Sequence, residues 1–214
     1  MRAPGLALLL GLSGLVGCAT GSGGSDHYLR YTAFDVGGGE HATLRWQAKQ
    51  MPLRVHLPEP PADIASDPEA VFDAVRDGVT DWEGAAGEGV PSFTFVKDPG
   101  EADIPIVWEE APSGWFIAHC VYDNHLMQRR FGVARILVTT RWHGQEVPLQ
   151  QLYETVLHEM GHALGLGGHS PDPGDIMYKS TSTARELTPR DRETLRRLYA
   201  RPNGKSLIGP RSAD

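Results

Sequence analysis

The sequence predicts a single α+β domain. Its 214 residues are enough for one ordinary domain, and contents of 40% hydrophobic and 22% charged residues are typical of a globular protein. Short apolar runs between Gly- and Pro-rich turns predict strands, and apolar residues spaced three and four apart predict helices. Their order is a strand, a helix, several strands and two further helices, without an internal repeat.

The charge of the chain limits its partners. The formal charge is −7, the pI is about 5.7, and no stretch is rich in Lys and Arg. Nucleic-acid binding needs a basic surface, so nucleic acid is not an expected partner. A monomer is expected.

The N-terminal residues resemble a bacterial lipoprotein signal. Arg2 supplies a short positive region, and the apolar stretch Leu6–Val16 is too short to span a bilayer. Gly17, a small residue, stands directly before Cys18, as lipoprotein processing requires. We therefore predict that Cys18 becomes the lipid-bearing first residue. The alternative is an ordinary secretory signal, cleaved near Ala19 to give a secreted protein.

Residues 1–17 are thus a predicted signal peptide, and residues 18–43 are predicted to hold the lipid anchor and a flexible tether, Gly/Ser-rich over 19–27. Position 19 lacks the Asp that the lipoprotein pattern associates with the inner membrane, which favours the outer membrane or the cell surface. The exported protein is then anchored in the bacterial cell envelope, with the membrane as a partner through its lipid. Cys120 is the one cysteine left, so no internal disulfide is expected.

The folded domain is predicted over residues 44–200. Its first strand is Leu53–Leu57, which a Pro-rich loop ends. A helix follows, with Asp67 or Ser66 as its cap and Pro68 in its first turn. Its side chains at helical spacing, expected to face the core, are Val71, Phe72, Val75, Val79 and Trp82.

Four more strands and two helices complete the expected domain. The strands are Ser92–Val96, Ala102–Trp108, Trp115–Tyr122 and Ala134–Thr139. One helix follows the last strand. The final helix begins at Thr188-Pro189, and its apolar positions are Leu195, Leu198 and Tyr199. Residues 201–214 are predicted to be a frayed tail.

The helix after the last strand contains the motif HEMGH at residues 158–162. Residues 151–157 lead into it without Gly or Pro, so the helix continues through both histidines. His158 and His162 are four residues apart and project from one face, where both imidazoles can bind one metal ion. Glu159 follows the first of them, out of the ligand line, where a carboxylate can act on a water at the metal.

A third ligand follows the helix. Gly165 can end the helix, because Gly takes a left-handed conformation without a Cβ penalty. The chain then turns through Gly167 and Gly168 and can return His169 as a third nitrogen ligand. Three protein ligands and one open position are typical of catalytic zinc, whereas structural zinc is usually closed by four. The alternative is that HExxH occurs here by chance, with solvated histidines on an amphipathic helix.

These residues resemble a known family. HEMGHALGLGGHS and the later DIMY are similar to the signature of the metzincin zinc endopeptidases, and closest to its matrixin branch. The resemblance covers about residues 44–200. It implies a twisted, mostly parallel sheet with an antiparallel edge strand, a metal-site helix, a Met-turn and a C-terminal helix. The site residues that it implies are His158, His162 and His169 as zinc ligands, Glu159 as general base and Met177 in the Met-turn.

The match has two departures near the site and one elsewhere. Three residues, rather than the family's two, separate Gly165 from His169, and the extra one is most simply one of two glycines. The ligands of the family's second, structural zinc have few counterparts, and Asp123 and His125 are the nearby candidates. No Asp-rich loop has the spacing of a calcium site, so neither a second zinc nor calcium is supported. No propeptide with a switch cysteine is visible.

The predicted function is hydrolysis of peptide bonds in a protein or peptide substrate by a zinc-activated water, with Glu159 as the base. By the same resemblance, the substrate lies extended along an edge strand near Ala118 and pairs with its backbone. The alternative is an envelope-anchored zinc-binding or interaction module without catalysis. The extra residue before His169 suggests it, because a displaced third ligand would slow the chemistry. Glu159 counts against that alternative, because a non-catalytic site needs no base.

Overall fold

The computed structural model describes residues 26–61, 65–110, 116–180 and 182–206. Cys18 and the predicted signal peptide therefore lie outside the described residues, and the lipid anchor stays a prediction. Within the described ranges, no helix combines the length and the apolar character needed to cross a membrane.

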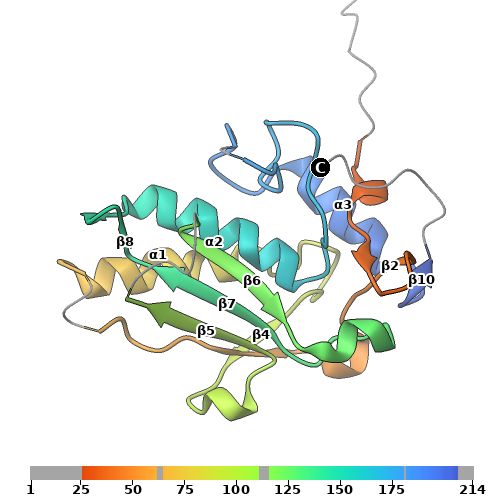
Figure 1. The fold of residues 1–214 in the computed structure, drawn as a ribbon, viewed down its shortest axis with the longest axis horizontal. Helices are drawn as coiled ribbons and strands as arrows, with labels where there is room; N and C mark the ends of the chain where they lie inside the picture. The colour runs from red at the N-terminus through yellow and green to blue at the C-terminus, as the bar shows by residue number, and fades with distance from the viewer. Residues whose placement is uncertain (1–25, 62–64, 111–115, 181, 207–214) are drawn as a thin grey trace, which may run out of the picture.

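A five-stranded sheet forms the centre of the fold (Figure 1). In sheet order its strands are β4 (Phe93–Phe95), β3 (Leu53–His56), β5 (Ile104–Glu109), β7 (Ala134–Thr139) and β6 (Ala118–Tyr122). The first four run parallel, whereas β6 pairs antiparallel with β7 and forms one edge. The prediction of a mostly parallel sheet with an antiparallel edge strand is confirmed.

Burial alternates along β3 and most of β7 because successive side chains point to opposite faces of a sheet. In β3, Leu53 and Val55 are fully buried while Arg54 is exposed. In β7, Ile136 is fully buried while Arg135 is exposed. The buried face is the one that the helices cover.

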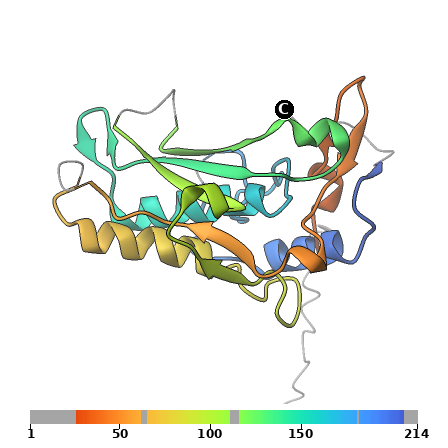
Figure 2. The same cartoon turned by 90° about the horizontal axis from the view of Figure 1, so that it is seen from below.

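Helices α1 (Pro68–Thr80) and α2 (Leu149–Ala163) lie on the same face of the sheet (Figure 2). They approach closely at Gly78, where an added Cβ would come within 3.0 Å of the Tyr153 carbonyl oxygen. Helix α1 begins as predicted, because Asp67 accepts a hydrogen bond from the Ala70 N–H and Pro68 occupies the first turn.

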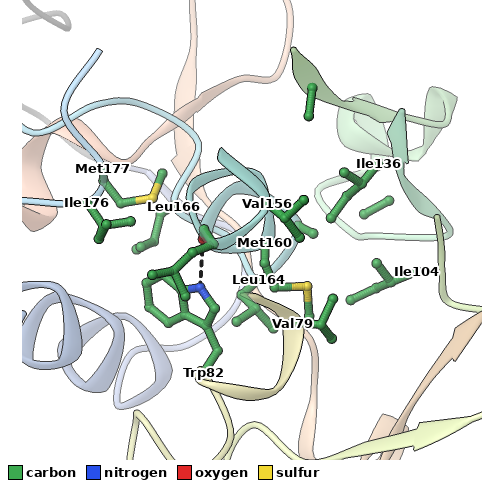
Figure 3. Close-up of a cluster of buried hydrophobic side chains, with 14 of the residues drawn as sticks. Val79, Trp82, Ile104, Ile136, Val156, Met160, Leu164, Leu166, Ile176 and Met177 are labelled. Carbon is green, nitrogen blue, oxygen red and sulfur yellow. Dashed lines mark hydrogen bonds between the residues drawn. The ribbon is translucent and has the colours of Figure 1, made fainter. Parts of the chain in front are cut away.

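The core between sheet and helices surrounds α2 (Figure 3). Four of the five core-facing side chains predicted around α1 are buried, but Phe72 is only half-buried. Phe72 lies about 100° round the helix from its neighbour Val71, outside the buried stripe. Two indoles fix α2 in place: Trp82 Nε1 donates to the Leu157 carbonyl and Trp46 Nε1 to the Ala163 carbonyl, both at 2.8 Å.

Helix α3 (Pro189–Tyr199) begins at the predicted residue. Thr188 caps it in a capping box with Asp191, each side chain bonding to the other's backbone N–H. Leu195 and Leu198 are buried, as the sequence predicts, and so is Asp191.

The folded domain begins well before residue 44, which corrects the predicted extent of the tether. A 3-10 helix, η1 (Leu29–Tyr31), is followed by a small antiparallel sheet of β1 (Phe34–Asp35), β2 (His41–Thr43) and β10 (Lys205–Ser206). Tyr28, Leu29 and Phe34 are 1%, 4% and 6% exposed and belong to the main core. Strand β10 likewise lies within the predicted tail. These short segments lack a periodic pattern, and their partners are distant in sequence.

Shorter elements connect the rest. A hairpin of β8 (Arg141–Trp142) and β9 (Gln145–Glu146) precedes α2, and the sequence did not predict it. Its turn residues His143 and Gly144 have φ values of 50° and 79°, as a two-residue type I′ turn requires. Three further 3-10 helices are η2 (Ala48–Gln50), η3 (Pro99–Glu101) and η4 (Asn124–Gln128).

Candidate metal centre

Helix α2 ends in a Schellman motif built on Gly165. The Gly165 N–H donates to the His162 carbonyl at 2.9 Å, and the Leu166 N–H donates to the Gly161 carbonyl at 3.0 Å. Gly165 has φ +117°, and a Cβ there would overlap the Leu44 carbonyl oxygen. The chain therefore reverses at Gly165, as the sequence predicts.

The reversal brings three histidines together. One ring nitrogen from each of His158, His162 and His169 lies within 4.8 Å of the other two. Among the described residues, no other group of three or more His, Cys, Asp or Glu side chains converges in this way. Asp123 and His125, the candidates for a second metal, contact each other through carboxylate and imidazole.

Backbone carbonyls orient two of the rings. The His158 Nδ1 lies 2.8 Å from the Ile176 carbonyl oxygen, and the His162 Nδ1 lies 2.6 Å from the Leu166 carbonyl oxygen. Because a carbonyl only accepts, each Nδ1 carries the proton and each Nε2 carries a lone pair. These two Nε2 atoms lie 3.1 Å apart, with no proton available to bond them. Two lone pairs that face each other in this way can bind one cation.

Burial keeps these rings neutral. Desolvation lowers the pKa of His158 to about 4 and holds the pKa of His162 well below its usual range. The pKa of His169 is also lowered, chiefly by burial and further by the nearby Lys179. His169 is the most exposed of the three. Neutral imidazoles are the form that binds metal.

Glu159 is buried next to the three histidines and contacts the edge strand. Its Oε2 accepts a hydrogen bond from the Cys120 N–H in β6 at 2.8 Å. Burial raises the pKa of Glu159 to about 8, against the opposing effect of this hydrogen bond. Burial also raises the pKa of the Cys120 thiol, which accords with a packing role for that side chain.

Met177 lies under the ligand helix. It is fully buried, and a Cβ on Gly161 would overlap its sulfur (Figure 3). The Met177 carbonyl accepts from the Ser170 N–H at 2.7 Å, which closes the loop that follows His169. The packing explains why a glycine stands directly before His162.

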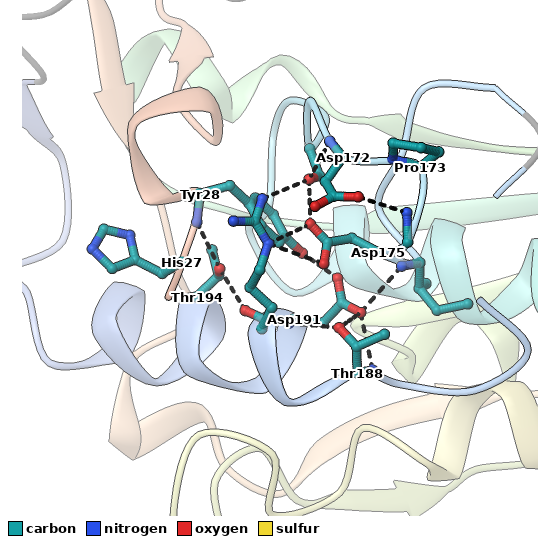
Figure 4. A network of polar contacts seen from close by, with 12 residues as sticks. His27, Tyr28, Asp172, Pro173, Asp175, Thr188, Asp191 and Thr194 are labelled. Carbon is teal, nitrogen blue, oxygen red and sulfur yellow. Dashed lines mark hydrogen bonds and ion pairs between the residues drawn. The ribbon is translucent and has the colours of Figure 1, made fainter. Parts of the chain in front are cut away.

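A buried carboxylate ties the Met177 loop to α3 and to the N-terminal segment (Figure 4). Asp191 Oδ2 accepts from the Ile176 N–H at 3.1 Å and from the Thr188 hydroxyl at 2.6 Å. Asp191 Oδ1 accepts from the Tyr28 hydroxyl at 2.6 Å. Beside it, Arg190 pairs with Asp175 at 2.8 Å.

A cavity of about 590 Å³ opens beside the histidines. Ala118, His158, Glu159 and His169 line its end nearest the ligands. The cavity continues along α2, where its lining includes Trp142, Glu154, Thr155 and Tyr178. An edge strand, an ionisable base and a cluster of histidines thus share one cleft.

The family follows from comparison with known proteins. A family model described as matrixin matches residues 45–200 of the 214. The chain belongs to the matrixin family. This is a family of metalloproteases, and it implies zinc as the metal. None of the curated proteins compared with the chain matches it.

The matrixin fold is also seen in a solved structure. The structure of myroilysin aligns with 75% of this chain and 99% of its own, with a TM-score of 0.50 and 14% sequence identity. At that identity the likeness concerns the fold alone. The family match begins at residue 45, so it leaves out η1, β1 and β2, which the structure includes in the folded domain.

Several contributions to this matrixin site had no signal in the sequence. The Ile176 and Leu166 carbonyls and the Cys120 N–H are backbone groups, which every residue carries. Trp142 and the hairpin that holds it were missed because the strands have two residues each. His158, Glu159, His162, His169 and Met177 all lie at one end of α2, and Ala118 lies on the adjoining edge strand.

Proposed function

We propose that this matrixin is a zinc-dependent endopeptidase in which Glu159 is the general base. One observation carries the proposal: the unprotonated Nε2 atoms of His158 and His162 face each other at 3.1 Å, beside a carboxylate in an open cleft. His169 supplies the third nitrogen within 4.8 Å. A zinc ion held by these three nitrogens would keep a fourth position for water or substrate, as in catalytic zinc sites.

The residues fit a zinc ion in chemistry and in size. Zinc prefers nitrogen and sulfur ligands, and the site offers three neutral imidazoles. With zinc–nitrogen distances of about 2.0–2.1 Å, tetrahedral geometry separates two ligand nitrogens by about 3.3 Å, close to the separation of the first two Nε2 atoms. Hydrogen bonds from both Nδ1 atoms to carbonyls are the usual support for such ligands.

In the proposed reaction, zinc when bound supplies a Lewis acid that activates water and polarises the scissile carbonyl. The Cys120 N–H holds Glu159 Oε2, which leaves Oε1 to accept the proton of the attacking water. Glu159 then gives this proton to the leaving amine. The free edge of β6 pairs with the extended substrate through its backbone, and the cavity along α2 receives one substrate side chain.

The alternative function is a non-catalytic zinc-binding module in the cell envelope. The reason to consider this function is that the extra residue before His169 would displace the third ligand. The His169 ring nitrogen lies within 4.8 Å of a ring nitrogen of each of the other two histidines, which supports the catalytic function over this alternative. No other observation favours this function, and the same experiment tests both.

The test compares zinc-loaded wild type with Glu159→Ala on a peptide library. We expect the variant to keep one zinc per chain and to lose hydrolysis by a factor of about 10² to 10⁴, the usual contribution of a general base. Glu88→Ala is the matched control, because Glu88 is exposed in a turn and does not line the cavity. Wild-type rates in Glu159→Ala would remove Glu159 from the mechanism. Zinc binding without cleavage by the wild type would leave the binding module.

A further inference from the structure

The glycine pair before His169 needs an explanation beyond chain flexibility. Gly167 and Gly168 stand where the family pattern has one residue fewer. Neither has a positive φ, so their backbone conformation does not demand glycine. Space demands it: a Cβ on Gly168 would overlap the Tyr31 carbonyl oxygen, and one on Gly167 would lie 2.7 Å from the ring of Phe34. Both neighbours belong to the N-terminal segment.

That segment is itself firmly held. The Tyr28 hydroxyl donates to Asp191 at 2.6 Å, and the Tyr28 N–H donates to the Thr194 hydroxyl at 3.1 Å (Figure 4). Thr32 is completely buried, and its hydroxyl donates to the Leu29 carbonyl at 2.9 Å. At the other end, the Phe34 ring packs edge-on against Tyr122 and Phe131. The segment 28–34 therefore presents a fixed backbone to the ligand loop.

One peptide group links this backbone to a metal ligand. The peptide between Leu166 and Gly167 accepts from His162 Nδ1 through its carbonyl, at 2.6 Å. Its N–H donates to the Thr32 carbonyl at 2.9 Å. A peptide group is planar, so fixing the direction of its N–H also fixes the direction of its carbonyl. The position of Thr32 thereby sets the orientation of the His162 ring.

We propose that segment 28–34 positions the metal ligands, with Thr32 orienting His162 through the Leu166–Gly167 peptide and Tyr31 confining the backbone that leads into His169. The inference rests on the proposed function, because it assumes that the histidines bind zinc. It assigns a role in metal binding to residues that precede the family match. It also accounts for the extra residue, since the glycine pair is what lets the ligand loop lie against this segment.

The first test is the zinc affinity of Gly168→Ala, measured by competition with a chromogenic chelator. An added methyl group forces the ligand loop and Tyr31 apart. Loss of a group that orients a metal ligand typically weakens metal binding 10- to 100-fold, so we expect the zinc dissociation constant to rise by about that factor. The matched control is Gly100→Ala, whose Cβ meets only the Asp98 side chain, at 3.1 Å and beyond, far from the site in sequence. Its dissociation constant should equal the wild-type value.

A second readout separates positioning from stability. The unfolding midpoint of the zinc-free protein reports the fold alone, so it is measured for the same variants. A folded Gly168→Ala that binds zinc as tightly as the wild type overturns the inference, even if its midpoint falls. If Gly168→Ala does not fold, Tyr28→Phe takes its place. Tyr153→Phe is the control, because it also removes a tyrosine–aspartate hydrogen bond, to Asp81 at 2.6 Å, but lies outside segment 28–34 and does not line the cavity.

For that second pair, a zinc dissociation constant raised in Tyr28→Phe and unchanged in Tyr153→Phe supports the inference, whereas equal constants in both overturn it. If the wild type binds no zinc, both the proposed metal site and this inference are wrong. If the wild type binds zinc and hydrolyses peptides, and all variants bind zinc as tightly as it does, only the inference is wrong.

Discussion

Asp191 shows how much of this site depends on a single buried side chain. Its two carboxylate oxygens accept hydrogen bonds from the N-terminal segment, from the helix cap and from the backbone next to Met177. The side chain is fully buried, so each of these donors would lose its partner without gaining water. The same residue, Ile176, supplies through the next peptide group the carbonyl that orients His158.

Asp191→Asn is therefore expected to lower the free energy of unfolding of the zinc-free protein by about 2–3 kcal/mol, since an amide nitrogen cannot accept and leaves a buried donor unpaired. Chemical denaturation measures the difference. Asp73→Asn is the control, because Asp73 makes an exposed ion pair with Arg76 that contributes little. Equal stability of the two variants would show that water or a rearranged partner replaces the Asp191 contacts.

At the scale of elements, the sequence predicted what local chemistry determines. Asp67 and Thr188 cap their helices, and Gly165 ends α2, because each acts on backbone groups within a few residues of itself. The motif spacing also predicted which histidines converge. The segment 28–43 was assigned to the tether because its order comes from partners more than 150 residues away, such as Asp191 and Thr194. No sequence pattern within the segment indicates that it contacts those distant residues.

The end of α2 offers a test that separates two costs of replacing a glycine. Gly39 has φ +77° with no atom within 4 Å of an added Cβ, so Gly39→Ala costs conformational strain alone, about 1–2 kcal/mol. Gly165→Ala adds overlap with the Leu44 carbonyl, and overpacking costs a further 1–3 kcal/mol, so we expect a loss of about 3 kcal/mol. Denaturant unfolding of both variants gives the comparison. A Gly165→Ala variant no less stable than Gly39→Ala would mean that the backbone at Leu44 shifts at little energetic cost.

At the scale of the whole molecule, the two ends of the described chain close the same side of the domain. Strand β2 pairs with β1 on one side and with β10 on the other, and the core residues Tyr28, Leu29 and Phe34 pack with α3 and the central sheet. The family match spans residues 45–200, so it contains the histidine cluster but leaves out η1, β1, β2 and β10. Whether residues 45–200 fold without this closure depends on how much free energy the buried N-terminal side chains contribute.

Burying a large apolar side chain contributes about 1.5–3 kcal/mol, so Tyr28, Leu29 and Phe34 together contribute about 5–9 kcal/mol. The whole stability of an ordinary domain is about 5–15 kcal/mol. We therefore expect a chain that begins at residue 44 to be largely unfolded at 25 °C, whereas one that begins at residue 26 folds. Near-UV circular dichroism and urea unfolding of the two chains measure this. A cooperative transition at the same urea midpoint in both would contradict it, and would reduce the N-terminal segment to a passive cover. Unfolding of the shorter chain alone would show that this matrixin domain begins at its N-terminal segment, before residue 45, where the family match begins.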